Sequence, residues 1–187
     1  METHPLNTQQ VLQEKKKLFL RRQSWIRLVI SLLCTAAVTF FLFSTVLGIA
    51  SIRGTSMNPA LYEKDVVLFF RLGHYKAGDI VILKAQDNLQ EEYIKRIIGV
   101  PGDTVDIDDS GRVILNGNPL KEPYAVGVTQ KKESVQYPLT LGTEQYFVLG
   151  DNRENSLDSR NYGPVTASQI EGKAVALLRV ADRTHPH

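Results

Sequence analysis

The sequence predicts a mainly β domain, an antiparallel sheet structure, carried on a single N-terminal transmembrane helix. Residues 28–50 form an apolar run without a charged residue. Residues 51–187 show little helical periodicity and many short Val, Ile, Leu and Phe runs broken by Gly, Pro, Asn and Asp, which is typical of short strands. A chain of 187 residues, 43% of them hydrophobic, is long enough for one globular domain and an appended segment.

Residues 1–27 are expected to form a basic cytoplasmic N-terminus. They hold two acidic residues and six basic ones, Lys15, Lys16, Lys17, Arg21, Arg22 and Arg27. Because cytoplasmic flanks of membrane spans are rich in Lys and Arg, the residues after Ala50 are expected on the extracytoplasmic side of the cell membrane. The whole chain has a net charge of +2, which is too small to indicate a nucleic-acid partner.

Residues 28–50 are expected to form the membrane anchor. About 20 apolar residues at about 1.5 Å each match a hydrocarbon core of about 30 Å, and Ser and Thr can return their hydroxyls to the helix backbone. A cleavable signal is an alternative, with Gly48 and Ala50 at its −3 and −1 positions, but the apolar region of a signal usually spans about 7 to 15 residues. A buried core helix is a second alternative, and it would need a larger surrounding domain.

The domain of residues 51–187 is expected to be a single β domain, because it contains no internal repeat and no low-complexity linker. Residues 108–111, Asp-Asp-Ser-Gly, indicate a hairpin, and Asn116-Gly117 is a strong two-residue turn signal. Residues 121–141 lack clear periodicity and are expected to form a loop-rich insertion. The candidate strands are 65–70, 79–84, 92–98, 104–107, 112–115, 145–149 and 173–178.

Histidine, cysteine and metal chemistry are not expected. His74 lies in a turn-like stretch, and the other two histidines of the outer domain fall in the last three residues, so a general base must come from elsewhere. The single Cys34 excludes an intramolecular disulfide and a Cys-rich zinc site. Residues 151–158 fail as a calcium loop because Arg153 occupies the third ligand position. We therefore expect neither a metal nor a cofactor.

Ser56 is the first candidate for chemistry. It lies in residues 52–61, after the flexible Gly54 and before a turn that contains Pro59. Such a loop can present a hydroxyl with backbone N–H groups aimed at a developing oxyanion. A serine in a Gly/Pro turn is also commonly structural, so Ser56 alone does not establish an active site.

Lys95 is the second candidate. Strand alternation in residues 93–98 puts Lys95 and Arg96 on opposite faces, so one of the two cations points at the apolar side. Burial would disfavour the ammonium form. A shift of the lysine pKa from about 10.4 to about 7.5 costs roughly 4 kcal/mol and leaves a usable general base. The alternative is an edge strand with two solvated cations.

A dense polar loop, residues 150–160, follows the apolar residues 146–149. Such a loop commonly bonds its own backbone through Asn, Asp and Ser side chains. The same density of donors and acceptors would also suit the surroundings of a buried lysine.

Taken together, these stretches resemble bacterial type I signal peptidases in their compact Gram-positive form. The resemblance covers nearly the whole chain, and five motif boxes in family order behind a membrane span are highly specific. They are Ser56-Met57-x-Pro59-x-Leu61, Gly78-Asp79-Ile80-Val81, Tyr93-x-Lys95-Arg96, Gly99-x-Pro101-Gly102-Asp103, and Gly150-Asp151-Asn152 through Ser156-x-Asp158-Ser159-Arg160.

The resemblance implies a signal-peptidase-like β domain and a membrane-bound serine endopeptidase with a Ser/Lys dyad. Ser56 would attack the peptide carbonyl. Lys95, neutral in the resting site, would take the Ser56 proton and later deliver one to the leaving amine. The family often carries an oxyanion-donor Ser two residues before the nucleophile, where this chain has Gly54. The backbone N–H of Ser56 is therefore expected to do most of this work.

The resemblance also implies supporting roles in the polar loop. Ser156 would orient the Lys95 amine. Two ion pairs would stabilise the surroundings, Arg96 with Asp151 and Asp158 with Arg160.

The implied partners are secretory preproteins and the lipid bilayer. Five residues separate Ala50 from Ser56, and an extended chain spans about 3.5 Å per residue, so the nucleophile would work within about 20 Å of the membrane surface. That is where a preprotein presents an Ala-x-Ala cleavage site. Small pockets would accept the −1 and −3 side chains, with apolar residues of strands such as 66–70 as candidates to shape them.

Parts of the sequence are compatible with two other functions. A self-cleaving, repressor-type Ser/Lys protease resembles this chain around the Gly-x-Ser-Met and Lys boxes, but the membrane span and the box at residues 150–160 argue against it. A catalytically inactive, membrane-anchored preprotein-binding module is the alternative from outside the enzymes. Intact Ser56 and Lys95 argue against that module.

Overall fold

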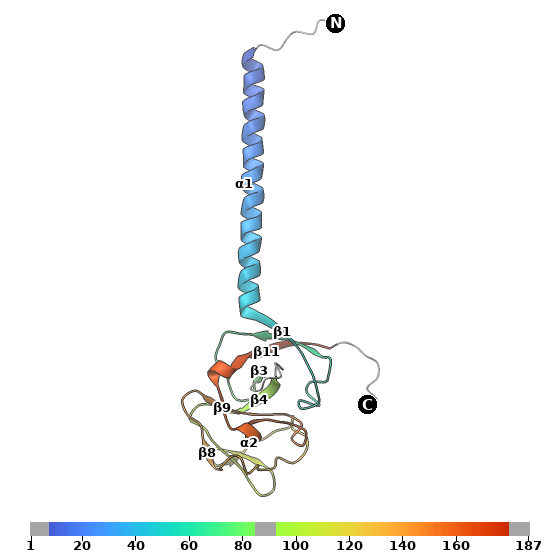
Figure 1. The fold of residues 1–187 in the computed structure, drawn as a ribbon, viewed down its shortest axis with the longest axis vertical. Helices are drawn as coiled ribbons and strands as arrows, with labels where there is room; N and C mark the ends of the chain where they lie inside the picture. Colours follow the sequence, from blue (N-terminus) through green and yellow to red (C-terminus); the bar gives the residue numbers. More distant parts are fainter. Residues whose placement is uncertain (1–7, 85–92, 180–187) are drawn as a thin grey trace. The chain divides into compact units, whose positions relative to one another are not determined.

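The structure is a computed structural model that describes residues 8–84 and 93–179 (Figure 1). The chain divides into two compact units, Met1–Thr45 and Val46–His187. The first unit holds nearly all of helix α1 (Thr8–Val46), and the second holds the strands.

Helix α1 exposes its apolar side chains. Phe40 is 76% exposed and Leu33 is 65% exposed. Residues Lys15–Val46 are the one helical segment within the described ranges that is long and apolar enough to cross a membrane. As expected, hydroxyls bond to the helix backbone: Thr35 Oγ1 donates to the Ser31 carbonyl at 2.9 Å. The helix can therefore present a continuous apolar surface to lipid.

The helix ends earlier than the expected anchor, at Val46 instead of Ala50. The next residues form strand β1 (Leu47–Ser51), which pairs antiparallel with β2 (Val66–Phe70). Gly48 lies opposite Phe69, whose ring occupies the space that a side chain at Gly48 would fill. Because this packing requires an extended backbone, residues 47–50 belong to the β unit although their composition continues the apolar run.

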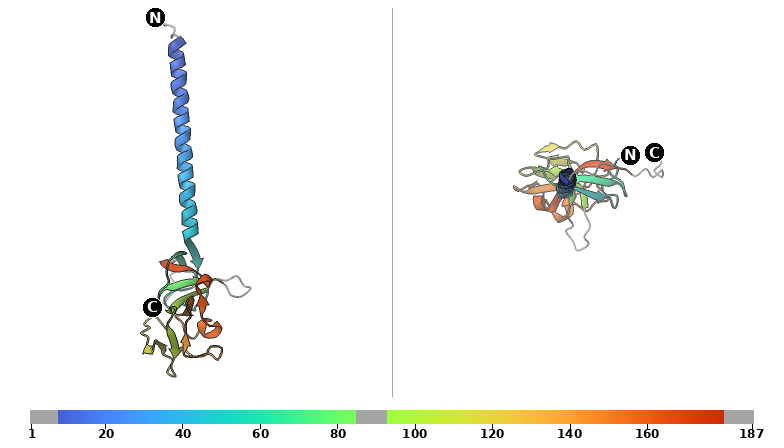
Figure 2. Two further views of the ribbon diagram at one scale, coloured as in Figure 1. Left: turned by 90° about the vertical axis from the view of Figure 1, so that its left-hand side faces the viewer. Right: turned by 90° about the horizontal axis from the view of Figure 1, so that it is seen from above.

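Two antiparallel sheets make up the β unit, and Figure 1 and the left view of Figure 2 place the smaller one at the end opposite β1. The larger sheet has the order β1-β2-β11-β3-β4-β9-β10, and the smaller has the order β7-β6-β5-β8. The remaining bounds are β3 (Ile80–Leu83), β4 (Tyr93–Gly99), β5 (Thr104–Ile107), β6 (Val113–Leu115), β7 (Asn118–Pro119), β8 (Leu139–Thr140), β9 (Gln145–Leu149), β10 (Val165–Thr166) and β11 (Ile170–Leu178).

The predicted mainly β class and every predicted strand are confirmed, with shifts at some ends. The prediction for residues 92–98 corresponds to β4, and Glu92 itself lies outside the described residues. Four strands, β1, β7, β8 and β10, were not predicted. Three of these have only two residues, too few for an alternating pattern, and β1 is hidden inside the apolar run.

Both predicted turns are present. Asp108 Oδ1 accepts hydrogen bonds from the backbone N–H groups of Ser110 and Arg112 and closes the hairpin between β5 and β6. Asn116 and Gly117 both have positive φ angles, 52° and 80°, as a tight two-residue hairpin turn requires. The β6–β7 register follows from this turn.

The insertion at residues 121–141 is loop-rich, as predicted. It contributes the two-residue β8 to the smaller sheet, and Val126 forms an isolated parallel bridge with Asn152. These contacts are made with distant residues, so they leave no local period in the sequence.

Gly48→Ala tests the packing of β1 on β2. The new methyl group would collide with the Phe69 ring, which is 1% exposed and has no free space to move into. We expect the free energy of unfolding to fall by about 1–3 kcal/mol, measured by thermal unfolding of the full chain in detergent. Gly142→Ala is the control, since its nearest neighbour is the flexible Gln145 side chain. Equal stability of the two variants would contradict the assignment of β1.

Candidate active site

Ser56 lies on the connection between β1 and β2. The two ends of the connection are joined by the Ile52 N–H, which donates to the Asp65 carbonyl at 2.8 Å, and a turn around Ser56 is closed by the Asn58 N–H, which donates to the Thr55 carbonyl at 3.1 Å. Met57, the next residue, is 2% exposed and packs into the apolar cluster beneath β1 and β2. A buried anchor directly after Ser56 fixes the hydroxyl while leaving it partly accessible.

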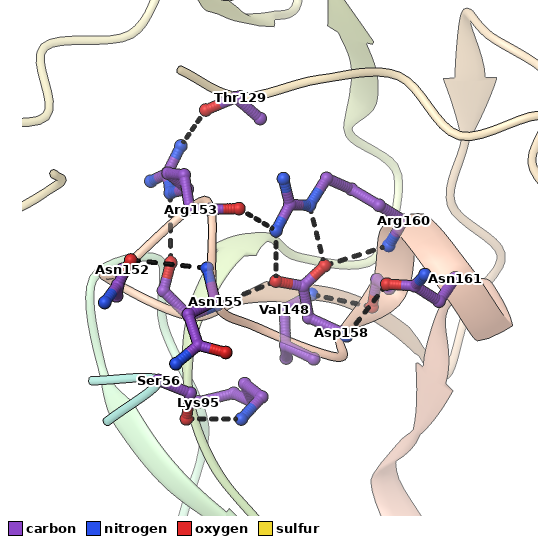
Figure 3. A network of polar contacts seen from close by, with 12 residues as sticks. Ser56, Lys95, Thr129, Val148, Asn152, Arg153, Asn155, Asp158, Arg160 and Asn161 are labelled. Atoms are coloured by element: carbon purple, nitrogen blue, oxygen red, sulfur yellow. Dashed lines mark hydrogen bonds and ion pairs between the residues drawn. The ribbon is translucent and has the colours of Figure 1, made fainter. Parts of the chain in front are cut away.

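Lys95 projects from β4 toward Ser56 and is 2% exposed. Its Nζ lies 2.9 Å from Ser56 Oγ and 3.0 Å from the Ile94 carbonyl oxygen (Figure 3). The two predicted candidates, 39 residues apart in the sequence, are therefore in hydrogen-bond contact. Lys95 is the cation that strand alternation buries.

Burial lowers the pKa of Lys95 to about 8 from its ordinary value of 10.5. The carboxylates of Asp158 and Asp151 act in the opposite direction and raise it, but desolvation is the larger effect. A substantial fraction of this amine is uncharged at mildly alkaline pH, as a general base requires.

Arg96 lies on the other face of β4 and pairs with Asp151. The guanidinium donates through Nε at 2.8 Å and Nη2 at 2.6 Å, and its Nη1 donates to the Gly78 carbonyl at 2.9 Å. The Asp151 side chain is completely buried. The predicted Arg96–Asp151 pair is therefore present as a two-point contact beside Lys95.

Asp158 and Arg160 form the second predicted pair. Arg160 Nε and Nη2 donate to the two carboxylate oxygens of Asp158, both at 2.9 Å, and both residues are at most 1% exposed. Asp158 also caps the short helix α2 (Ser159–Tyr162) and accepts from the Gly150 N–H at 3.1 Å. The pair closes the polar loop onto itself, as Figure 3 shows.

Ser156 does not make the predicted contact with Lys95. Its Oγ is buried, and the structure shows no hydrogen bond to it. It lies against Gly150, where an added Cβ would collide with the Ser156 side chain and would also stand 2.6 Å from the Ser56 carbonyl oxygen. Gly150 thus permits the close approach of the polar loop to Ser56. The orientation of Lys95 by Ser156 stays a prediction.

Two cavities share Ser56 and Lys95. One, of about 260 Å³, is lined among others by the apolar residues Ala50, Ile52 and Met57. The other, of about 250 Å³, is bordered by Thr55, Asn155 and Leu157 among others. Neither is lined by the expected strand 66–70, because Val67 and Phe69 point into the core cluster below Met57.

The sequence also predicts that His74 has no catalytic role and that the chain binds no metal. His74 is exposed on the loop after β2 and borders neither cavity, and the two C-terminal histidines lie outside the described residues. Within residues 8–84 and 93–179, no three His, Cys, Asp or Glu side chains gather in a way that could hold a metal ion.

Three residues around the site, Asn152, Arg153 and Glu122, have contacts that were not predicted. Asn152 N–H donates to the Ser56 carbonyl at 3.0 Å, and Arg153, 2% exposed, pairs with Glu122 at 2.5 Å. In the sequence, Arg153 stands out only as a residue that does not fit a calcium loop. A cation in a dense polar loop after a buried strand could also have indicated a buried ion pair with an acidic side chain. Glu122 carries no comparable local signal.

Comparisons with known proteins identify the family. Residues 22–178 match the model of the family described as signal peptidase, peptidase S26. Signal peptidase I P of Bacillus subtilis subsp. natto is 32% identical over 84% of this chain and 90% of its own length. Signal peptidase I S of Bacillus subtilis strain 168 is 33% identical over 78% of this chain and 82% of its own.

A signal peptidase I from Enterococcus faecalis is similar in its crystal structure. The two chains are 31% identical with a TM-score of 0.46, and the match covers 55% of this chain and 97% of that one. The family match over most of the chain, together with relatives above 30% identity along nearly their full length, shows that this chain belongs to the signal peptidase I family, peptidase S26.

Proposed function

We propose that this signal peptidase uses a Ser56/Lys95 dyad to cut exported preproteins after Ala-x-Ala sites. The observation that carries the proposal is the 2.9 Å contact between Lys95 Nζ and Ser56 Oγ. Burial of the lysine supports it, because desolvation favours the uncharged amine, and the uncharged amine is the form that can accept a proton.

The proposed reaction has two halves. Neutral Lys95 takes the Ser56 Oγ proton as the oxygen attacks the scissile carbonyl, and the resulting ammonium gives a proton to the leaving amine as the peptide bond breaks. The signal peptide is then held as an ester on Ser56. Lys95 next takes a proton from a water molecule that attacks this ester, and Ser56 recovers its proton on release.

The oxyanion formed in each half is proposed to bind the Ser56 backbone N–H. Gly54 has no side chain to offer, and its φ of +75° suits glycine. Gly54, two residues before Ser56, thus leaves an open space where a substrate backbone can approach, and the oxyanion donor becomes a main-chain group.

The cavity lined by Ala50, Ile52 and Met57 is proposed to accept the small −1 and −3 side chains of the substrate. We further propose that residues 1–27 lie in the cytoplasm, that the lipid bilayer holds the apolar part of α1, and that the β unit works on the extracytoplasmic side. The basic N-terminal flank supports this orientation.

Incubation of the detergent-solubilised chain with a purified preprotein tests the proposal. We expect a product whose new N-terminus, read by mass spectrometry, follows an Ala-x-Ala sequence, and we expect no product with Ser56→Ala. His74→Ala is the matched control and should cut like the wild type, because His74 is exposed and lies outside both cavities. Binding of the preprotein without cleavage would favour the inactive binding module.

Activity should increase with pH through about 8, because only the uncharged Lys95 accepts a proton. One unit below its pKa, about a tenth of the amine is uncharged, so kcat/KM should be about tenfold lower there than on the alkaline plateau. The measurement is a pH profile of preprotein cleavage, with circular dichroism to confirm folding at each pH. A cleavage optimum at about pH 5 would exclude Lys95 as the base.

Lys95→Met should abolish cleavage and stabilise the fold at neutral pH. Since folding lowers the Lys95 pKa to about 8, its protonation opposes folding below that pH, and the penalty fades as pH rises toward 10.5. Removing the amine should raise the free energy of unfolding by up to about 3 kcal/mol at neutral pH and by much less near pH 10. Urea unfolding in detergent at the two pH values measures this difference.

The control for this experiment is Lys173→Met, because the Lys173 side chain is 40% exposed and pairs with Asp79 at 2.7 Å. It should give no gain at either pH. A Lys95→Met chain that still cuts, or that loses stability at neutral pH, would contradict the proposed state of the amine.

A further inference from the structure

The insertion contains a short segment, Glu122–Thr129, whose contacts converge on residues 151–153 and on Arg96. We propose that this segment, called here the brace, sets the position of Ser56 for catalysis, and that the Glu122–Arg153 ion pair is its main lock. The inference rests on the proposed dyad, because it assigns positioning residues to that same site.

The brace pairs with residues 151–153 through the backbone. The Val126 N–H donates to the Asp151 carbonyl at 2.8 Å, and the Val126 carbonyl accepts from the Arg153 N–H at 2.9 Å. Successive backbone groups of an extended chain point to opposite sides, so the N–H of Asn152 faces away from the brace. That N–H donates to the Ser56 carbonyl at 3.0 Å. Residues 151–153 therefore connect the brace on one edge to the nucleophile on the other.

The side chain of Arg153 fastens this connection. It donates to Glu122 Oε1 at 2.5 Å, to Thr129 Oγ1 at 2.6 Å and to the Gly150 carbonyl at 3.0 Å. The side chains of Arg153 and Glu122 are 1% and 10% exposed. Because a guanidinium buried this deeply needs a charged partner, loss of the Glu122 charge must disturb the backbone that Arg153 holds.

Tyr124 links the brace to the catalytic strand by a second route. Its ring covers the Arg96 guanidinium at 4.1 Å, and Arg96 is the residue that pairs with Asp151. The same short segment therefore contacts Arg96, the sequence neighbour of Lys95, and residues 151–153, which bond to Ser56 through the Asn152 N–H. A segment whose only task was to cover the smaller sheet would not require these contacts.

The test compares kcat and KM of preprotein cleavage by the full chain in detergent. Glu122→Gln keeps the shape of the side chain and removes the charge. We expect kcat to fall about tenfold or more with KM changed less than about twofold, since misplacement of a nucleophile by a fraction of an ångström affects the reaction more than binding. Assays are run at a temperature at which circular dichroism shows each variant folded.

Lys131→Ala is the matched control. Lys131 also lies in the insertion and pairs with Asp106 of β5 at 3.1 Å, but this pair is partly exposed and belongs to the smaller sheet. Its kcat should stay within about twofold of wild type. Glu122→Asp, which keeps the charge on a shorter side chain, should recover part of the lost kcat.

If Glu122→Gln does not fold, Tyr124→Leu tests whether the brace positions Ser56, and we expect the same fall in kcat. The proposal is overturned if the folded variant keeps the wild-type kcat, if KM rises while kcat stays constant, or if Lys131→Ala loses as much kcat. Failure of the wild-type chain to cut the preprotein would instead reject the Ser56/Lys95 proposal, so the two failures are distinguishable.

Discussion

Exclusion of water from the Lys95 amine is the constraint on which the rest of the site depends. Lysine at its ordinary pKa is almost fully charged in neutral solution and cannot act as a base. Here β4 carries Lys95 into a region where the residue is 2% exposed, and its amine donates to Ser56 and to a backbone carbonyl and lies over the Tyr93 ring. The hydrogen-bond contact and the lowered pKa thus have the same structural origin.

This constraint explains why the neighbouring carboxylates are paired. Asp151 and Asp158 each raise the pKa of Lys95, against the effect of burial. Arg96 contacts Asp151 at two points, and Arg160 contacts Asp158 at two points. The positive guanidinium groups therefore offset much of the effect of the two carboxylates on the Lys95 amine. Buried ion pairs contribute little net stability, because desolvation offsets their attraction. Their value here lies in the electrostatics and in fixing the polar loop.

Much of this arrangement could be predicted from the sequence, and the failures have physical reasons. Every strand of three or more residues except β1 has an apolar pattern that predicts it, and the predicted candidates Ser56 and Lys95 are in contact. The end of α1 could not be predicted, because the apolar run at Leu47–Ser51 satisfies a helix in lipid and a strand opposite Phe69 equally well. Glu122 could not be found, because its meaning depends on Arg153, 31 residues away.

In the proposed dyad, the chemistry of the base is separate from the placement of the nucleophile. The state of Lys95 is set by burial on β4, whereas the position of Ser56 is set by Met57 below it and by Asn152 beside it. Changes to the burial of Lys95 therefore affect the pH dependence of the proposed reaction. Changes to the contacts that position Ser56 affect its rate at every pH. Because a titratable base is sensitive to any nearby charge, a nucleophile held by backbone hydrogen bonds and an apolar anchor can be positioned without altering the proton affinity of the amine.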